Sequence, residues 1–210
     1  MSRDSRRLFQ LATLAAACAL PSMLQSQVST TRGLSVGVHV IGTSLATEGN
    51  DTRSGGGLSA RLGYGFNRIV TGFVHIDGSE IEIPEEQGNG AGLTGAWSMA
   101  HAEVGARFHF ANSLRRWVPY LETSAGARVV SVKDARVNGQ DAGKVDFNGG
   151  AFTVGGGVST FFRQTLAFDV NLKVTGGQFT EIDLGGVALQ NLEIEATSVR
   201  FGVGIIWWPK

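Results

Sequence analysis

Two neighbouring runs of alternating side chains constrain the fold of this chain more than any other feature. In the run Trp97–Phe110, Glu103 and Arg107 occupy odd-numbered positions. The even-numbered positions from 100 to 110 carry only alanine, valine and phenylalanine. The run Val118–Val130 also alternates, with Glu122 on one face and leucine, threonine, alanine and valine on the other. Because side chains of a β-strand point alternately to opposite faces, both runs predict strands with one apolar and one charged face.

The length of these runs bears on where such strands belong. Each run has about 12–14 residues, which exceeds the ~9–11 residues that a tilted strand needs to cross a bilayer. A soluble antiparallel sheet with one wet face also alternates and remains an alternative for this hairpin alone. Small apolar residues on one face and mid-strand charges on the other favour a transmembrane barrel, which is apolar outside and polar inside.

The rest of the chain repeats the pattern. Strands are expected at Gly33–Gly42, Gly57–Phe66, Ile69–Gly78, Gly150–Phe162, Thr165–Thr175 and Glu193–Trp207, of which Ile69–Gly78 alternates least clearly. Long polar connections are expected at Thr43–Gly56, Ser79–Thr94, Lys133–Gly149 and Gly176–Asn191, and they alternate with short ones. The prediction is an all-β fold, an eight-stranded antiparallel up-and-down transmembrane β-barrel with short periplasmic turns and long outer loops.

The composition agrees with a protein built of strands. Glycine occupies 30 of the 210 positions and proline only 4. The 18 basic and 18 acidic residues balance, which gives no reason to expect a nucleic-acid partner. Beyond the N-terminus no stretch approaches the ~18 consecutive apolar residues of a membrane helix. In a membrane the chain must therefore close into a barrel, because only closure pairs every backbone group.

The N-terminus predicts export. Three arginines among the first seven residues precede the mostly apolar stretch Leu8–Leu24, which is the pattern of a secretory signal peptide. Cleavage after Ser26 would divide the chain into a signal peptide, 1–26, and an outer-membrane β-barrel domain, 27–210. A lipoprotein site at Cys18 is the competing interpretation.

Aromatic residues gather near the short turns. Amphipathic rings favour the membrane interface, so we expect an aromatic girdle at this end of the barrel, with Phe161 and Trp208 in the same region. The girdle residues are Tyr64, Phe66, Phe108, Phe110, Trp117, Phe162 and Trp207.

The inward face carries charges at mid-strand. Eight strands enclose a space only wide enough for side chains, and an unpaired buried charge is costly. We therefore expect an ion-pair network in which Glu103 and Glu122 lie near Arg61, Arg107 or Arg128. Its role is structural, as a plug of the lumen; a gated narrow conduit is the alternative. The network residues are Arg61, Glu103, Arg107, Glu122, Arg128, Asp169, Lys173 and Arg200.

Four stretches, Glu103–Phe110, Val118–Glu122, Gly155–Val158 and Val199–Trp207, resemble a known family. The chain is similar to the small eight-stranded outer-membrane barrels of Gram-negative bacteria, of the OmpA transmembrane domain and OmpX type, within the outer membrane protein beta-barrel domain family. The resemblance implies a monomer in the cell outer membrane that contacts lipid, lipopolysaccharide and the barrel-assembly machinery, with outer loops that bind an unknown extracellular ligand. Such barrels usually end on an aromatic residue, whereas three residues follow Trp207 here.

Enzymatic function is not expected. Some outer-membrane barrels modify lipids with serine and histidine, but alternation puts Ser98 and His101 on opposite faces, so His101 cannot activate Ser98. The chain has no GxSxG or HExxH motif. The acidic stretch Glu80–Glu86 matches no metal-loop spacing and favours a solvated loop. We expect no catalytic residue, metal or cofactor, and a lipid-modifying enzyme remains the remoter alternative.

Overall fold

All eight expected strands form in the computed structural model of the chain. Residues 1–30, which hold the expected signal peptide and Cys18, lie outside the described residues. The structure describes residues 31–47, 52–81, 93–110, 116–137, 140–184 and 187–209.

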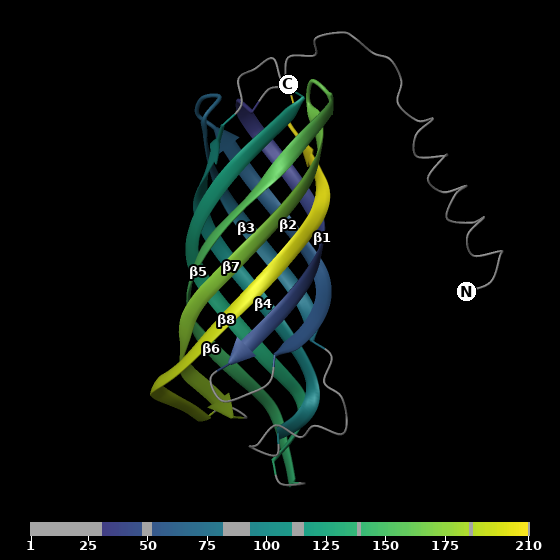
Figure 1. Cartoon of the computed structure of the whole chain (residues 1–210). Helices are drawn as coiled ribbons and strands as arrows, with labels where there is room; N and C mark the ends of the chain where they lie inside the picture. The colour runs from purple at the N-terminus through teal and green to yellow at the C-terminus, as the bar shows by residue number, and fades with distance from the viewer. Residues whose placement is uncertain are drawn as a thin grey trace, which may run out of the picture.

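The strands close into one barrel in chain order (Figure 1). Each strand pairs antiparallel with the next, and β1 pairs with β8 to complete the ring. The predicted fold class, an eight-stranded antiparallel up-and-down β-barrel, is confirmed. No helix among the described residues is long and apolar enough to cross a membrane. The strands are β1 (Gly33–Thr47), β2 (Arg53–Gly65), β3 (Val70–Ile81), β4 (Leu93–His109), β5 (Trp117–Val137), β6 (Gln140–Arg163), β7 (Leu166–Leu184) and β8 (Val187–Trp207).

Local hydrogen bonds close the short-turn end. Between β2 and β3, the side-chain oxygen of Asn67 accepts hydrogen bonds from the backbone amides of Ile69 and Val70, at 2.7 and 2.8 Å. Asparagine favours turns because its side chain can bond backbone groups two residues on. After β8, the amide of Trp208 donates to the carbonyl of Thr165 in the β6–β7 turn, at 2.8 Å, so the C-terminal segment lies at this end (Figure 1).

At the opposite end of the barrel, which we call the outer end, the connections are shorter than expected. Most of Lys133–Gly149 and Gly176–Asn191 is strand, and only residues 138–139 and 185–186 separate the strands there. The expected alternation of long and short connections is also wrong, because residues 110–116 at the short-turn end outnumber residues 48–52 at the outer end. The physical reason is that strands rising above a membrane are polar on their outer face, so their sequence resembles a loop.

The two faces of the wall are inverted relative to a soluble protein. Outward residues Val40, Leu58 and Val104 are 66%, 69% and 64% exposed, whereas inward Arg107 and Asp169 are 2% and 0% exposed. Soluble domains almost never bury charges while exposing an apolar surface all round. The exposed apolar band fits the lipid-facing surface of a transmembrane barrel.

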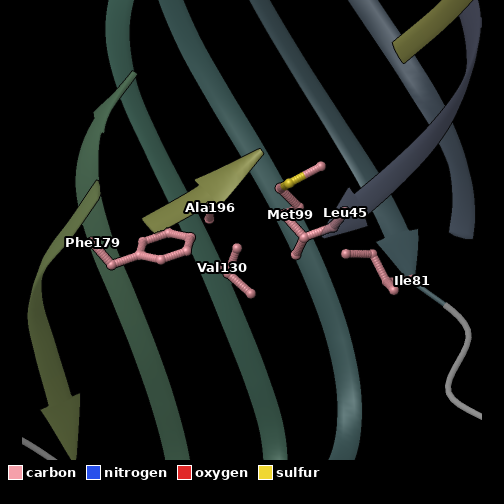
Figure 2. Close-up of a cluster of buried hydrophobic side chains, with 6 residues drawn as sticks. All are labelled: Leu45, Ile81, Met99, Val130, Phe179 and Ala196. Carbon is pink, nitrogen blue, oxygen red and sulfur yellow. The ribbon is translucent and has the colours of Figure 1, made fainter. Parts of the chain in front are cut away.

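Apolar layers cross the barrel at both ends of its charged interior. At the short-turn end, Phe161 and Trp208 pack inside with Val118, Ala167 and Ile206. Their rings lie 4.9 Å apart. Both were expected at the membrane interface. Phe161 is next to Phe162 and Trp208 is next to Trp207, and both of these neighbours face outward. Because side chains alternate along a strand, Phe161 and Trp208 face inward. At the outer end a second layer consists of Leu45, Ile81, Met99, Val130, Phe179 and Ala196 (Figure 2).

Candidate functional site

The charged interior begins near the short-turn end with Asp169 of β7, which is fully buried. Tyr120 and Ser159 donate hydrogen bonds to its carboxylate, at 2.8 and 2.6 Å. His39 Nε2 lies 3.0 Å from the same carboxylate, and Arg107 Nη1 lies 3.4 Å away. Groups from β1, β4, β5 and β6 therefore converge on one acid of β7, which ties strands that are far apart around the ring.

Glu122 of β5 forms the middle of the interior and meets three cations. Arg61 donates two hydrogen bonds to its two oxygens, at 2.8 and 2.9 Å, and Arg107 donates a third at 2.9 Å. Lys173 Nζ lies 3.4 Å from it. The guanidinium of Arg61 also stacks 4.0 Å above the ring of Phe73. Bidentate pairs of this kind fix geometry as well as charge.

Arg200 of β8 holds the third group of charges, nearer the outer end. It forms ion pairs with Asp77 and, at 2.5 Å, with Glu103. Thr153 and Ser124 donate further hydrogen bonds to Glu103, at 2.7 and 3.1 Å. Both carboxylates are thus held by several donors, and the side chain of Arg200 joins β8 to β3 and β4 across the lumen.

Two histidines connect this outer group to the middle one. His101 Nδ1 lies 2.9 Å from Asp77, and His75 Nε2 lies 3.1 Å from it. His75 Nε2 also lies 3.2 Å from Lys173 Nζ, which in turn contacts Glu122. The three groups therefore form one continuous network along the barrel axis.

Arg128 differs from its expected role. Its side chain is fully buried, yet it donates hydrogen bonds to the backbone carbonyls of Ala196 and Gly177, at 3.1 and 3.4 Å. Its guanidinium lies 4.6 Å from the ring centre of Phe179, in the outer apolar layer. Among the described side chains no carboxylate forms an ion pair with it. The expected pairing of Arg128 with Glu103 or Glu122 is wrong, because Arg128 lies a level above both acids.

The sequence predicted the inward face of the network but only part of its pairing. Glu122 has two expected partners, Arg61 and Arg107, whereas Glu103 meets Arg200 instead. Several members were not singled out beforehand, and alternation within their strands is the signal that could have found them. These members are His39, His75, Asp77, Tyr120, Thr153, Ser159 and Thr175.

The expected girdle residues all lie on the outer surface near the short turns. Their exposed fractions run from 41% to 66%, as expected for rings that face lipid and its interface. They are Tyr64, Phe66, Phe108, Phe110, Trp117, Phe162 and Trp207.

The positions of Ser98 and His101 do not favour catalysis by this pair. Ser98 pairs with Glu80, whose side chain faces outward, and His101 faces the lumen, so the two lie on opposite faces of the wall. The described residues contain no group of three or more potential metal ligands. Most of the acidic stretch Glu80–Glu86 lies outside the described residues. What the interior does provide is a dense set of charge-assisted hydrogen bonds between strands.

Comparison with solved structures finds barrels of the same architecture. Neisserial surface protein A shares 14% identity with a TM-score of 0.61, covering 83% of this chain and 96% of that one. Ail, the attachment invasion locus protein of Yersinia pestis, shares 13% identity with a TM-score of 0.53, covering 84% and 100%. Ail is also known in complex with the heparin analogue sucrose octasulfate. At these identities the likeness extends to the fold alone.

Sequence comparison assigns the family. No curated protein matches the chain. A family model does match, over residues 11–206, which is most of the sequence. Its match agrees with the closed barrel, the exposed apolar band and the charged interior. The chain belongs to the outer membrane protein beta-barrel domain family, whose place is the outer membrane.

Proposed function

We propose that this protein is a non-enzymatic outer-membrane barrel with a plugged, ion-paired lumen and a structural or surface-interaction role. The observation that supports the proposal is the position of the buried charges between the two apolar layers. Asp77 is the most accessible charged residue of the network, and it is only 6% exposed. A conducting pore needs continuous water along its axis, and the burial of these charged side chains argues against it.

The bonding of the acids supports a plug over a gate. Glu122, Asp169, Glu103 and Asp77 each bond to at least two partners on other strands. Removing one partner from a buried ion pair typically costs about 3–5 kcal/mol, so a gating movement would be expensive. A narrow gated conduit remains the second candidate, because Glu122 is shared by three cations that could exchange around it.

Planar-bilayer recording tests the plug directly. We expect no conductance steps from the reconstituted chain. We also expect none from Phe161→Leu, which keeps the apolar layer at the short-turn end. Removal of bulk from both layers, by Phe161→Ala with Phe179→Ala, is expected to admit ions. Steady conductance from the unmodified chain would contradict the plug and favour the conduit.

A surface role would fall to the outer wall. Strands β5–β8 extend beyond β1–β3 at the outer end (Figure 1). Exposed Glu193 and Glu195 and half-buried Glu181 lie on this wall, which gives an acidic contribution to its surface. The sulfated sugar analogue bound by Ail is therefore a poor guide to this chain, and we propose a cationic or neutral extracellular ligand. Contacts with lipopolysaccharide, assembly by the barrel-assembly machinery and a monomeric state complete the proposal.

The lipid-modifying alternative has a simple assay. Purified barrel should release no fatty acid from phospholipid or lipopolysaccharide. Activity that disappears in His101→Ala, with the fold retained, would overturn the non-enzymatic proposal. Heat-modifiable gel mobility of the purified barrel reports the fold in the same preparation.

A further inference from the structure

Arg128 of β5 carries a positive charge that no carboxylate of the described residues balances. Its side chain is fully buried, and its Nη2 donates hydrogen bonds to the backbone carbonyls of Gly177 and Ala196. The ring of Phe179 lies against the guanidinium. Carbonyl oxygens and aromatic rings carry only partial charges, and an arginine in a protein does not lose its proton. The charge of Arg128 is therefore solvated in part but not neutralised by these groups.

Buried hydrogen-bond donors without partners lie at the same place. Nε and Nη1 of Arg128 have no hydrogen-bond partner among the described residues. The hydroxyl of Ser198 is also buried without one, and Ser198 lies two residues from Ala196 on the inward face of β8. Buried donors are rarely left unbonded, because they have given up their bonds to water. A guanidinium offers donors and no acceptor, so the missing partner is an acceptor.

The charges of the buried interior indicate what kind of acceptor is missing. Among the described residues, five buried cations face four buried carboxylates, with the histidines counted as neutral. Protonation of any histidine would only enlarge this excess of positive charge. A water molecule could accept hydrogen bonds from these donors but would not balance the charge. The buried cations are Arg61, Arg107, Arg128, Lys173 and Arg200, and the buried carboxylates are those of Asp77, Glu103, Glu122 and Asp169.

The position of Arg128 in the barrel restricts the size and charge of the missing group. Arg128 lies between the ion-pair network and the outer apolar layer, to which Val130, Phe179 and Ala196 belong (Figure 2). The charge that acts on Arg128 from the network side is that of another cation, Arg200. An ion in this place loses most of its water, which costs more for a large charge than for a small one. A small monovalent anion meets both conditions.

We propose that Arg128 and Ser198 bind one small monovalent anion of the halide class, such as chloride, beneath the outer apolar layer. Nε and Nη1 of Arg128 donate hydrogen bonds to the anion, and the hydroxyl of Ser198 donates another. The anion balances the excess positive charge of the interior. This inference rests on the plugged, ion-paired lumen proposed above, and it adds to that network an ion taken up from solution. The stability of the barrel then depends on the halide concentration.

Urea unfolding of the full chain, refolded in lipid vesicles, tests the proposal as chloride replaces gluconate. The ionic strength is held constant so that screening does not change, and gluconate is too bulky for a buried site. Above the dissociation constant of chloride, the equilibrium constant of unfolding should fall about tenfold for each tenfold rise in chloride. Arg128→Met removes the donors and the excess charge, and its unfolding should not respond to chloride. The matched control, Arg163→Met at an exposed arginine of the short-turn end, should respond as the unmodified chain does.

A second variant supplies the missing charge from the protein itself. Ser198→Asp places a carboxylate on the inward face of β8 and keeps Arg128, so its stability should also be independent of chloride. This variant decides the question if Arg128→Met fails to fold. Unfolding of the unmodified chain that does not respond to chloride would overturn the proposal. An equal response in the unmodified chain, Arg128→Met and Ser198→Asp would also overturn it, because the effect would then be a general effect of salt.

Planar-bilayer recording of the same preparations separates failure of the anion site from failure of the plug. Steady conductance would overturn the plugged lumen on which the site rests. A barrel that does not conduct and does not respond to chloride would overturn the anion site alone.

Discussion

Neutralising Glu122 is the sharpest test of the ion-paired interior. The change Glu122→Gln keeps the shape of the side chain but removes the charge that Arg61, Arg107 and Lys173 share, at 2.8, 2.9 and 3.4 Å. All four side chains are at most 5% exposed, so water cannot replace the lost charge. Breaking a buried pair on one side costs about 3–5 kcal/mol, and we expect a loss of about this size.

A double-mutant cycle separates the lost charge from lost packing. Arg61→Met with Glu122→Gln removes one charge of each sign, so the unpaired excess created by Glu122→Gln alone is relieved. Replacing buried ion pairs with apolar groups is often neutral, and we expect the double variant to recover most of the loss. Glu195→Gln on the exposed outer wall is the control and should change stability by less than about 0.5 kcal/mol.

The assay is urea unfolding of barrels refolded in lipid vesicles, followed by heat-modifiable gel mobility and by tryptophan fluorescence. The free energies of unfolding of the four proteins of the cycle give the coupling between residues 61 and 122 directly. The reasoning is refuted if Glu122→Gln costs less than about 1 kcal/mol, or if adding Arg61→Met to it deepens the loss, since either result means that the charges are effectively solvated.

Two further predictions concern the wall itself. A Cβ at Gly126 would lie 1.9 Å from the carbonyl oxygen of Ala102, whereas a Cβ at Gly150 meets nothing within 4 Å. Gly126→Ala should therefore destabilise the barrel by about 1–3 kcal/mol, with Gly150→Ala near neutral, as measured by urea midpoints. Val104→Arg on the lipid face should cost about 2–4 kcal/mol if Val104 lies near the bilayer midplane; an unchanged midpoint in vesicles would contradict the lipid-facing assignment.

Alternation alone could predict the faces because parity is a local property. In β4 and β5 every second residue faces lipid, so Val104 and Leu121 are exposed while Glu103 and Glu122 are buried. The parity of β3 was less clear from the sequence, where Phe73 and Val74 are adjacent apolar residues. Phe73 turns out to face inward under Arg61, which puts Asp77, four residues on, inside the network as well.

Most partners across the lumen, unlike the expected pair of Arg61 and Glu122, could not be predicted because they depend on ring closure and register. Arg107 lies directly opposite Glu122 on neighbouring strands, and this pair was within reach of sequence reasoning. Arg200 meets Glu103 only because β8 curves back to β1, which places residues 97 positions apart within 2.5 Å. The same limit explains the outer end, where strand pairing above the membrane, and not hydropathy, determines how far β5–β8 extend.

The charged interior also has a consequence for membrane insertion. Strands β5 and β6 have 21 and 24 residues, which is the length of chain that spans a bilayer as a helix when it is apolar throughout. Between Trp117 and Val132 of β5 the only charged residues are Glu122 and Arg128, so this part of the strand would approach such a segment if both were apolar. Charges at alternate positions prevent this and cost little once the barrel closes, because they then bond to one another. The interior network therefore consists of the polar, inward-facing side chains of strands whose other face is apolar. The pairing of these side chains stabilises them inside the closed barrel.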